Sequence, residues 1–105
     1  MNIIKVGLLG CGRISQFHLN ALKDQPDSFE IVAVADVLSE RAQTMAAQYH
    51  AKAYASLEDM LQSETLDLVV LCTPSGLHPA QAKICAEAGI ACLSENHLAV
   101  FIKKR

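Results

Sequence analysis

Short apolar runs alternate along this chain with longer segments of helical character. The short runs are expected to be strands, and they cover residues 3–9, 30–35, 52–54, 66–72 and 90–93. The run 30–35 is rich in β-branched residues, as strands are. The longer segments have helical spacing of apolar residues or helix-capping signals, and they cover residues 13–23, 39–49, 56–62 and 79–88. We expect Ser39 and Ser56 to cap the second and third of these helices.

This alternation predicts an α/β fold in which helices cover both faces of a parallel sheet. The run 66–72 is nearly all apolar, as expected of a strand that is buried on both faces. Right-handed crossovers give the order 3-2-1-4-5, that of a Rossmann-type doubly wound parallel sheet of about five strands. Because the order reverses between strands one and four, the loops after those strands should meet where such sheets bind ligands.

Composition narrows the classes of function. The chain has 105 residues, which suits one domain, and its net charge of −2 comes from mixed acids and bases. This balance predicts no nucleic-acid partner and no membrane partner. No signal peptide or membrane-spanning run is evident, and none of the four cysteines has C-x-x-C spacing. We therefore expect a cytoplasmic protein whose cysteines act as small buried hydrophobes, with no metal site.

The turn after the first strand has the spacing G-x-G-x-x-S, in Gly10-Cys11-Gly12-Arg13-Ile14-Ser15. Gly10 permits a sharp turn, and Gly12 has no side chain to keep a pyrophosphate from the backbone. The helix beginning at Arg13 and Ile14 offers free N–H groups and a partial positive charge to phosphates. Alternatively, the two glycines only turn the chain.

An acid follows this turn at the distance typical of dinucleotide-binding sites. Asp36 ends the second strand, 21 residues after Ser15, where a carboxylate can accept hydrogen bonds from both hydroxyls of an adenosine ribose. It would repel a 2′-phosphate, which favours NAD over NADP. The alternative is that Asp36 is a turn acid. Arg41 either stacks on adenine or is an exposed helix residue.

The loop after the fourth strand is the second candidate part of the site. It reads Thr73-Pro74-Ser75-Gly76-Leu77-His78-Pro79 and should lie against the glycine turn. Thr73 offers a hydroxyl at the sheet mouth, Pro74 fixes the turn, and His78 is placed to face nicotinamide or substrate. The alternative is that Thr73 and Ser75 only cap the helix and that His78 is a surface residue.

Together with Glu95, these features resemble the N-terminal NAD-binding domain of the Gfo/Idh/MocA oxidoreductases. The resemblance covers nearly the whole chain and implies hydride transfer between NAD and a sugar or nucleotide-sugar. The heptapeptide 73–79 is similar to that of members that oxidise C3 of UDP-N-acetylated hexosamines or hexosaminuronates. The resemblance also implies that Glu95 contacts the nicotinamide ribose.

The chain departs from the family pattern after residue 90. Where the family has Glu-Lys-Pro, it has Glu95-Asn96-His97, and Asn96 cannot supply the ammonium group of the family lysine. We therefore assign no catalytic residue. We also expect residues 1–105 to be an incomplete Rossmann domain that lacks the substrate domain and a sixth strand. The fifth strand would then be an uncovered edge, which favours self-association.

Other functions fit parts of the same pattern. Three alternatives remain open. The chain is an inactive fragment of the oxidoreductase, a non-catalytic dinucleotide-binding or regulatory module, or the remnant of a disrupted gene. An S-adenosylmethionine methyltransferase also has a glycine turn and an acid after strand two, but the G-x-G-x-x-S spacing and the Thr-Pro loop argue against it.

Overall fold

The computed structural model describes residues 3–10, 29–94, 100 and 101. Within these residues the strands are β1 (Ile4–Leu9), β2 (Phe29–Ala35), β3 (Lys52–Tyr54), β4 (Leu68–Leu71), β5 (Ala91–Ser94) and β6 (Val100–Phe101). The helices are α2 (Ser39–Tyr49), α3 (Leu57–Ser63) and α4 (His78–Glu87), with a 3-10 turn η1 (Ser75–Leu77) before α4. The helix expected over 13–23 lies outside the described residues.

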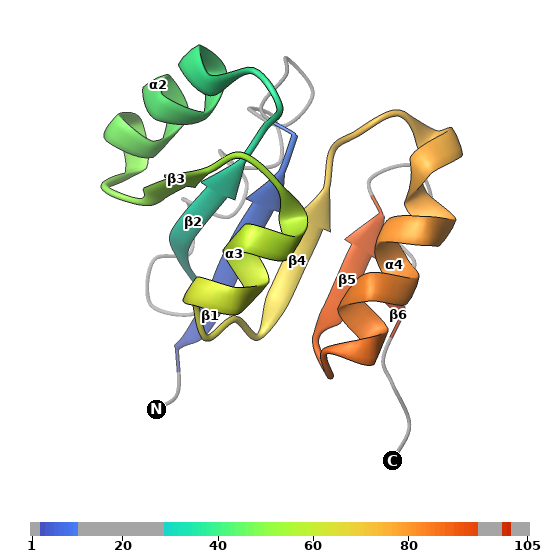
Figure 1. The fold of residues 1–105 in the computed structure, drawn as a ribbon. Coiled ribbons are helices and arrows are strands. Elements are labelled where there is room, and N and C mark those ends of the chain that lie inside the picture. The colour runs from blue at the N-terminus through green and yellow to red at the C-terminus, as the bar shows by residue number, and fades with distance from the viewer. Residues whose placement is uncertain (1–2, 11–28, 95–99, 102–105) are drawn as a thin grey trace.

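The strands form one sheet in the order β3-β2-β1-β4-β5-β6 (Figure 1). The pairings among the first five strands are all parallel. The predicted Rossmann-type order 3-2-1-4-5 is therefore confirmed, including the reversal between β1 and β4. The carboxyl ends of β1 and β4 consequently lie side by side, and Gly10 and Cys72, the first residues after these strands, lie at the same end of the sheet.

The expectations that the sheet lacks a sixth strand and that β5 would be an uncovered edge are both wrong. The two-residue strand β6 pairs with it antiparallel, with Cys92 opposite Phe101 and Leu93 opposite Val100. An antiparallel neighbour needs only a short return of the chain, so it can form close after β5. Pairing there satisfies backbone groups of β5 that would otherwise be exposed, and β6 becomes the terminal strand of the sheet among the described residues. Self-association of the chain stays a prediction.

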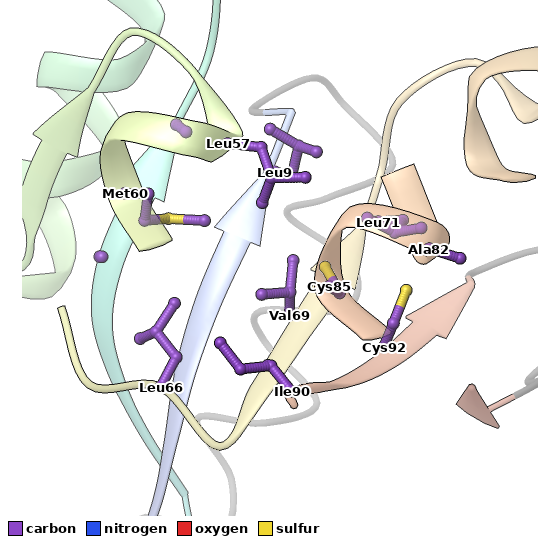
Figure 2. Close-up of a cluster of buried hydrophobic side chains, with 12 residues drawn as sticks. Leu9, Leu57, Met60, Leu66, Val69, Leu71, Ala82, Cys85, Ile90 and Cys92 are labelled. Carbon is purple, nitrogen blue, oxygen red and sulfur yellow. The ribbon is translucent and has the colours of Figure 1, made fainter. Parts of the chain in front are cut away.

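Helices cover both faces of the sheet, and each face has its own apolar cluster. The cluster under α3 and α4 is built around Leu57, Met60, Ala82 and Cys85 and the strand residues they contact (Figure 2). The opposite cluster lies under α2, where Met45 and Ala46 pack on Val6, Leu8, Val34 and Val70. Since successive strand residues point to opposite faces, β4 must be apolar throughout, and the continuous run in the sequence is explained.

Two cysteines belong to this core. Cys85 and Cys92 have no exposed surface, which confirms them as buried hydrophobes, while Cys72 is half-buried. A hydrogen bond with Cys92 and burial both raise the pKa of the Cys85 thiol. Cys85 therefore stays protonated at neutral pH. Cys11 lies outside the described residues.

The helix ends differ from expectation at one of two positions. Ser56 caps α3 as predicted, because its Oγ accepts a hydrogen bond from the backbone N–H of Asp59 at 3.1 Å. Ser39 does not cap α2, because Leu38 occupies the cap position and Ser39 is already helical. No helix among the described residues is long and apolar enough to cross a membrane.

Candidate functional site

A cleft of about 440 Å³ opens at the carboxyl ends of the central strands. The sequence-predicted residues that line it are Gly10, Asp36, Arg41, Thr73 and Pro74. They come from three separate segments of the chain, the turns after β1, β2 and β4. The structure therefore brings together at one site the glycine turn, the acid and the second loop.

Strand register explains why these turns meet. Leu9 at the end of β1 pairs with Ala35 of β2 on one side and with Leu71 of β4 on the other. Hydrogen bonds continue one residue beyond the strands, from Gly10 N–H to the Ala35 carbonyl and from Cys72 N–H to the Leu9 carbonyl, both at 2.8 Å. The carboxyl ends of the three strands are therefore in register, and hydrogen bonds between the strands fix the positions of Gly10 and Cys72, the first residues after β1 and β4.

Gly10 occupies a position that only glycine fits well. Its φ of +90° lies in the region that side chains rarely adopt. A Cβ built there would stand 3.0 Å from the Cys72 carbonyl carbon and 3.1 Å from Thr73 Cγ2. The turn after β1 therefore lies in direct contact with the loop after β4. Gly12, Arg13 and Ile14 lie outside the described residues.

Asp36 is a buried carboxylate on the cleft wall. Its side chain is 9% exposed, and its Oδ1 accepts a hydrogen bond from the Leu38 N–H at 2.8 Å. This bond fixes the orientation of the carboxylate and turns the chain from β2 into α2, so Asp36 does act as a turn acid. The same residue lines the cleft, so the turn does not exclude a binding role.

Arg41 lies in the first turn of α2, where its N–H donates to the Leu38 carbonyl at 3.0 Å. The residue is exposed and lines the cleft, as Asp36 does. The two residues lie five positions apart in the chain, on either side of the β2–α2 turn. The cleft wall formed by the β2–α2 turn therefore carries both signs of charge.

Thr73 is held by two hydrogen bonds to the start of α4. His78 Nε2 lies 2.7 Å from the Thr73 carbonyl oxygen. Because a carbonyl oxygen only accepts hydrogen bonds, Nε2 is the protonated ring nitrogen and donates to it. The Thr73 hydroxyl donates to Gln81 Oε1 at 2.5 Å. Because His78 is only 7% exposed, the alternative of a surface histidine is wrong. The alternative of a side-chain cap is also wrong, because Leu77 occupies the cap position of α4 without a side-chain hydrogen bond.

The apolar part of the cleft wall was missed by the sequence reasoning. Val37 is 89% exposed, and Leu38 and Leu77 are each 50% exposed, yet all three line the cleft. Leu57 and Ile84 also belong to this apolar part, and the polar side chains of Ser56, Glu58 and Gln81 line the cleft as well. The only available signal was the spacing of residues 77, 81 and 84, which places them on one face of a helix. Glu95, the remaining predicted residue, lies outside the described residues.

Comparison with known proteins agrees with this arrangement. The family model described as "Oxidoreductase family, NAD-binding Rossmann fold" matches residues 4–102. A 4-carboxy-2-hydroxymuconate-6-semialdehyde dehydrogenase from a Sphingobium species is 37% identical over 87 residues, which are 82% of this chain and 27% of the relative. The chain spans about a quarter of the length of the curated relatives it matches.

Solved structures give the same result. The WlbA dehydrogenase of Chromobacterium violaceum, solved with NADH and UDP-GlcNAcA, has a TM-score of 0.89 and 38% identity. The match covers 94% of this chain and 29% of that one. The 3-ketoreductase KijD10 of Actinomadura kijaniata, solved with NADP and TDP-benzene, has a TM-score of 0.84 and 27% identity, covering 93% of this chain and 30% of its own.

The family match covers nearly every residue from β1 to β6, and it contradicts the methyltransferase alternative. The fold, the strand order and the glycine turn with the acid that follows it are all typical of a Rossmann domain that binds a dinucleotide. The chain belongs to the Gfo/Idh/MocA oxidoreductase family and is its NAD-binding Rossmann domain.

Proposed function

We propose that this chain binds NAD in the cleft at the ends of β1, β2 and β4, as the cofactor domain of a sugar or nucleotide-sugar oxidoreductase. The cofactor, when bound, supplies hydride chemistry at its nicotinamide ring. The observation that carries the proposal is the shared cleft wall of Gly10, Asp36 and Thr73. A tight glycine turn, a buried acidic side chain and a hydroxyl at the ends of these strands are features of sites that bind the pyrophosphate and ribose of a dinucleotide.

Each residue has a proposed role that follows from its position. Gly10 forms the tight turn out of β1, and Gly12, which has no side chain, lets the pyrophosphate approach the backbone of the segment that continues with Arg13 and Ile14. Asp36 accepts hydrogen bonds from the adenosine ribose, which favours NAD over the 2′-phosphate of NADP, and Arg41 lies on the adenine side. Thr73 and Pro74 form the wall opposite Gly10. Glu95 contacts the nicotinamide ribose.

His78 has an indirect role in this proposal. It does not belong to the cleft wall formed by the described residues, and its imidazole is bonded to the Thr73 carbonyl. It therefore supports the site by holding the loop after β4 in place. This is a positioning role, and the two hydrogen bonds of Thr73, to His78 and to Gln81, attach the loop to α4.

The proposed substrate is a sugar or nucleotide-sugar. This is supported by the similarity to the WlbA dehydrogenase, whose structure contains UDP-GlcNAcA, at 38% identity. We propose that the substrate is held by a region that corresponds to the parts of the relatives beyond those that this chain spans. We assign no catalytic residue within residues 1–105, because Asn96 stands where the family lysine is expected.

Calorimetric titration with NAD, NADP and S-adenosylmethionine tests the cofactor proposal. We expect saturable binding of NAD and weaker binding of NADP. Asp36→Asn keeps an oxygen for the Leu38 N–H but removes the charge, so it should weaken NAD binding about tenfold and reduce the preference for NAD over NADP. Glu30→Gln, which neutralises an exposed carboxylate near the opposite end of β2, is the matched control. A folded wild-type chain that binds no NAD would refute the proposal.

Asn96 favours a second candidate function, a dinucleotide-binding module that does not catalyse hydride transfer. Without the family lysine, the proposed cofactor site lacks an ammonium group for proton transfer. Assays of NAD reduction with UDP-N-acetylated sugars, for the wild type and for Asn96→Lys, separate the two functions. Wild-type turnover would contradict the non-catalytic module, whereas turnover by the lysine variant alone would support it.

A further inference from the structure

Gln81 is the polar member of a strip on α4 that faces the cleft. Leu77, Gln81 and Ile84 all line the cleft, and their spacing places them on one side of α4. Gln81 is half-buried, so its amide is partly withdrawn from water. A polar group in such a position needs hydrogen-bond partners, either from the protein or from a bound molecule.

Thr73 fixes which end of the Gln81 amide is available to a ligand. In the structure the Gln81 amide oxygen faces Thr73 and accepts a hydrogen bond from its hydroxyl at 2.5 Å. The Thr73 carbonyl is occupied by His78 Nε2, so the threonine is itself held in place. Among the residues that the structure describes, no acceptor is bonded to the Gln81 amide nitrogen, and its two N–H groups are donors at the cleft wall.

The surroundings of this donor suit a purine base. The cleft is also lined by the apolar residues Val37, Leu38 and Leu57. Leu77, at the end of η1, and Ile84, on α4, line it one helical turn before and after Gln81. A flat ring with apolar faces packs well between such walls. Adenine also has ring nitrogens on its edge that accept hydrogen bonds, which a donor amide can read.

We propose that the Gln81 amide nitrogen donates a hydrogen bond to a ring nitrogen of the adenine of the bound dinucleotide, with Thr73 setting the amide orientation. This inference rests on the proposed binding of NAD in the cleft. It makes Gln81 a specificity-determining residue for the adenosine half of the cofactor, a role separate from that of Asp36 at the ribose. The nicotinamide half makes no contact with Gln81.

Two variants separate loss of the donor from loss of the Thr73 contact and from a change in charge. Gln81→Glu retains an oxygen that accepts from Thr73 but cannot donate, so we expect NAD affinity to fall about tenfold. Gln81→Met is uncharged and similar in length, and it should lower NAD affinity about threefold or more. Gln62→Glu adds the same charge at an exposed site on α3 and is the matched control.

The probes are NAD, AMP and nicotinamide mononucleotide, with affinities measured by calorimetry or by competition against NAD. For each Gln81 variant, we expect the affinity for AMP to fall by a factor similar to that for NAD. The affinity for nicotinamide mononucleotide should not change. Thr73→Val should weaken NAD binding less than Gln81→Glu, because the donor is kept and only its orientation is freed. Thermal unfolding of each variant checks that it is folded.

The outcomes distinguish this inference from the function on which it rests. If the wild type binds NAD and both Gln81 variants bind it equally well, Gln81 makes no contact and the inference is wrong. If Gln81→Glu lowers NAD affinity and Gln81→Met does not, charge repulsion explains the loss and the inference is wrong. The inference is also wrong if the affinity for nicotinamide mononucleotide falls as much as that for NAD. If the folded wild type binds no NAD, the proposed function fails and this inference falls with it.

Discussion

Gly10 and Cys72 lie so close that a Cβ at position 10 would stand 3.0 Å from the Cys72 carbonyl carbon. This contact joins the turn after β1 to the loop after β4 at the point where the strand order reverses. Two constraints meet at Gly10, a positive φ and a lack of space, and each alone would favour glycine. The geometry of the cleft therefore depends on the absence of one methyl group.

Gly10→Ala should destabilise the fold and weaken NAD binding. The φ of +90° and the short contact with the Cys72 backbone should together cost about 1–3 kcal/mol of unfolding free energy. Urea unfolding and calorimetric titration measure the two effects. Gly76→Ala is the control, because a Cβ at Gly76 meets nothing within 4 Å. Equal stability of the two variants would contradict the close approach.

His50→Gly should stabilise the protein. His50 follows α2 with φ 55° and ψ 37°, a left-handed conformation that costs a residue with a Cβ roughly 1 kcal/mol. Glycine adopts it freely, and part of this gain is offset by the greater freedom of glycine in the unfolded chain. We expect a net gain of about 0.5 kcal/mol in urea unfolding. A variant less stable than the wild type would show that the His50 side chain contributes more than the strain costs.

Tyr54→Phe should lower stability at neutral pH, and the difference should shrink in alkali. The Tyr54 hydroxyl donates to Glu64 Oε2, and this hydrogen bond raises the pKa of Tyr54 above its usual 10.0. Folding thus favours the protonated tyrosine. Its contribution is complete below the pKa of the unfolded chain and is lost as pH rises through the higher pKa of the folded state.

Urea unfolding at pH 7 and above pH 10 checks this dependence. We expect Tyr54→Phe to lose about 1 kcal/mol at pH 7. A double-mutant cycle with Glu64→Gln isolates the pair from other effects of each change. A coupling that does not decline above pH 10 would contradict the assigned hydrogen bond.

Much of the fold was predictable, because the signals involved are periodic. The apolar run ending in β4 and the β-branched run of β2 indicated buried parallel strands, and short connections with right-handed crossovers then left one order for them. The two-residue strand β6 was not predictable in this way, because two residues are too short for any periodicity to emerge. Its partner, β5, was consequently expected to be an edge.

The site was predictable where sequence position alone fixes location. Gly10 and Asp36 each follow a strand directly, and Thr73 follows β4 after one residue, so the topology places all three at the cleft whatever their neighbours do. Gln81 was missed because its role depends on which side of α4 faces the cleft. His78 was uncertain for the same reason, since nothing local distinguishes a buried histidine from an exposed one at the start of a helix.

His78→Ala should loosen the loop after β4. The imidazole Nε2 is bonded to the Thr73 carbonyl at 2.7 Å in a site where His78 is only 7% exposed. Removing the donor leaves a carbonyl without this partner and a space where the ring was, which should cost about 1–3 kcal/mol. Because Thr73 lines the cleft, NAD affinity should fall together with stability.

His78→Gln distinguishes this positioning role from simple packing. The glutamine amide can donate to the Thr73 carbonyl, so it should recover part of the stability and of the NAD affinity that alanine loses. Met at position 78 fills a similar volume without a donor and should recover neither fully. The measurement is urea unfolding and NAD titration of all three variants. If His78→Met equals His78→Gln in both, packing alone explains the buried histidine, and the hydrogen bond to Thr73 does not organise the cleft.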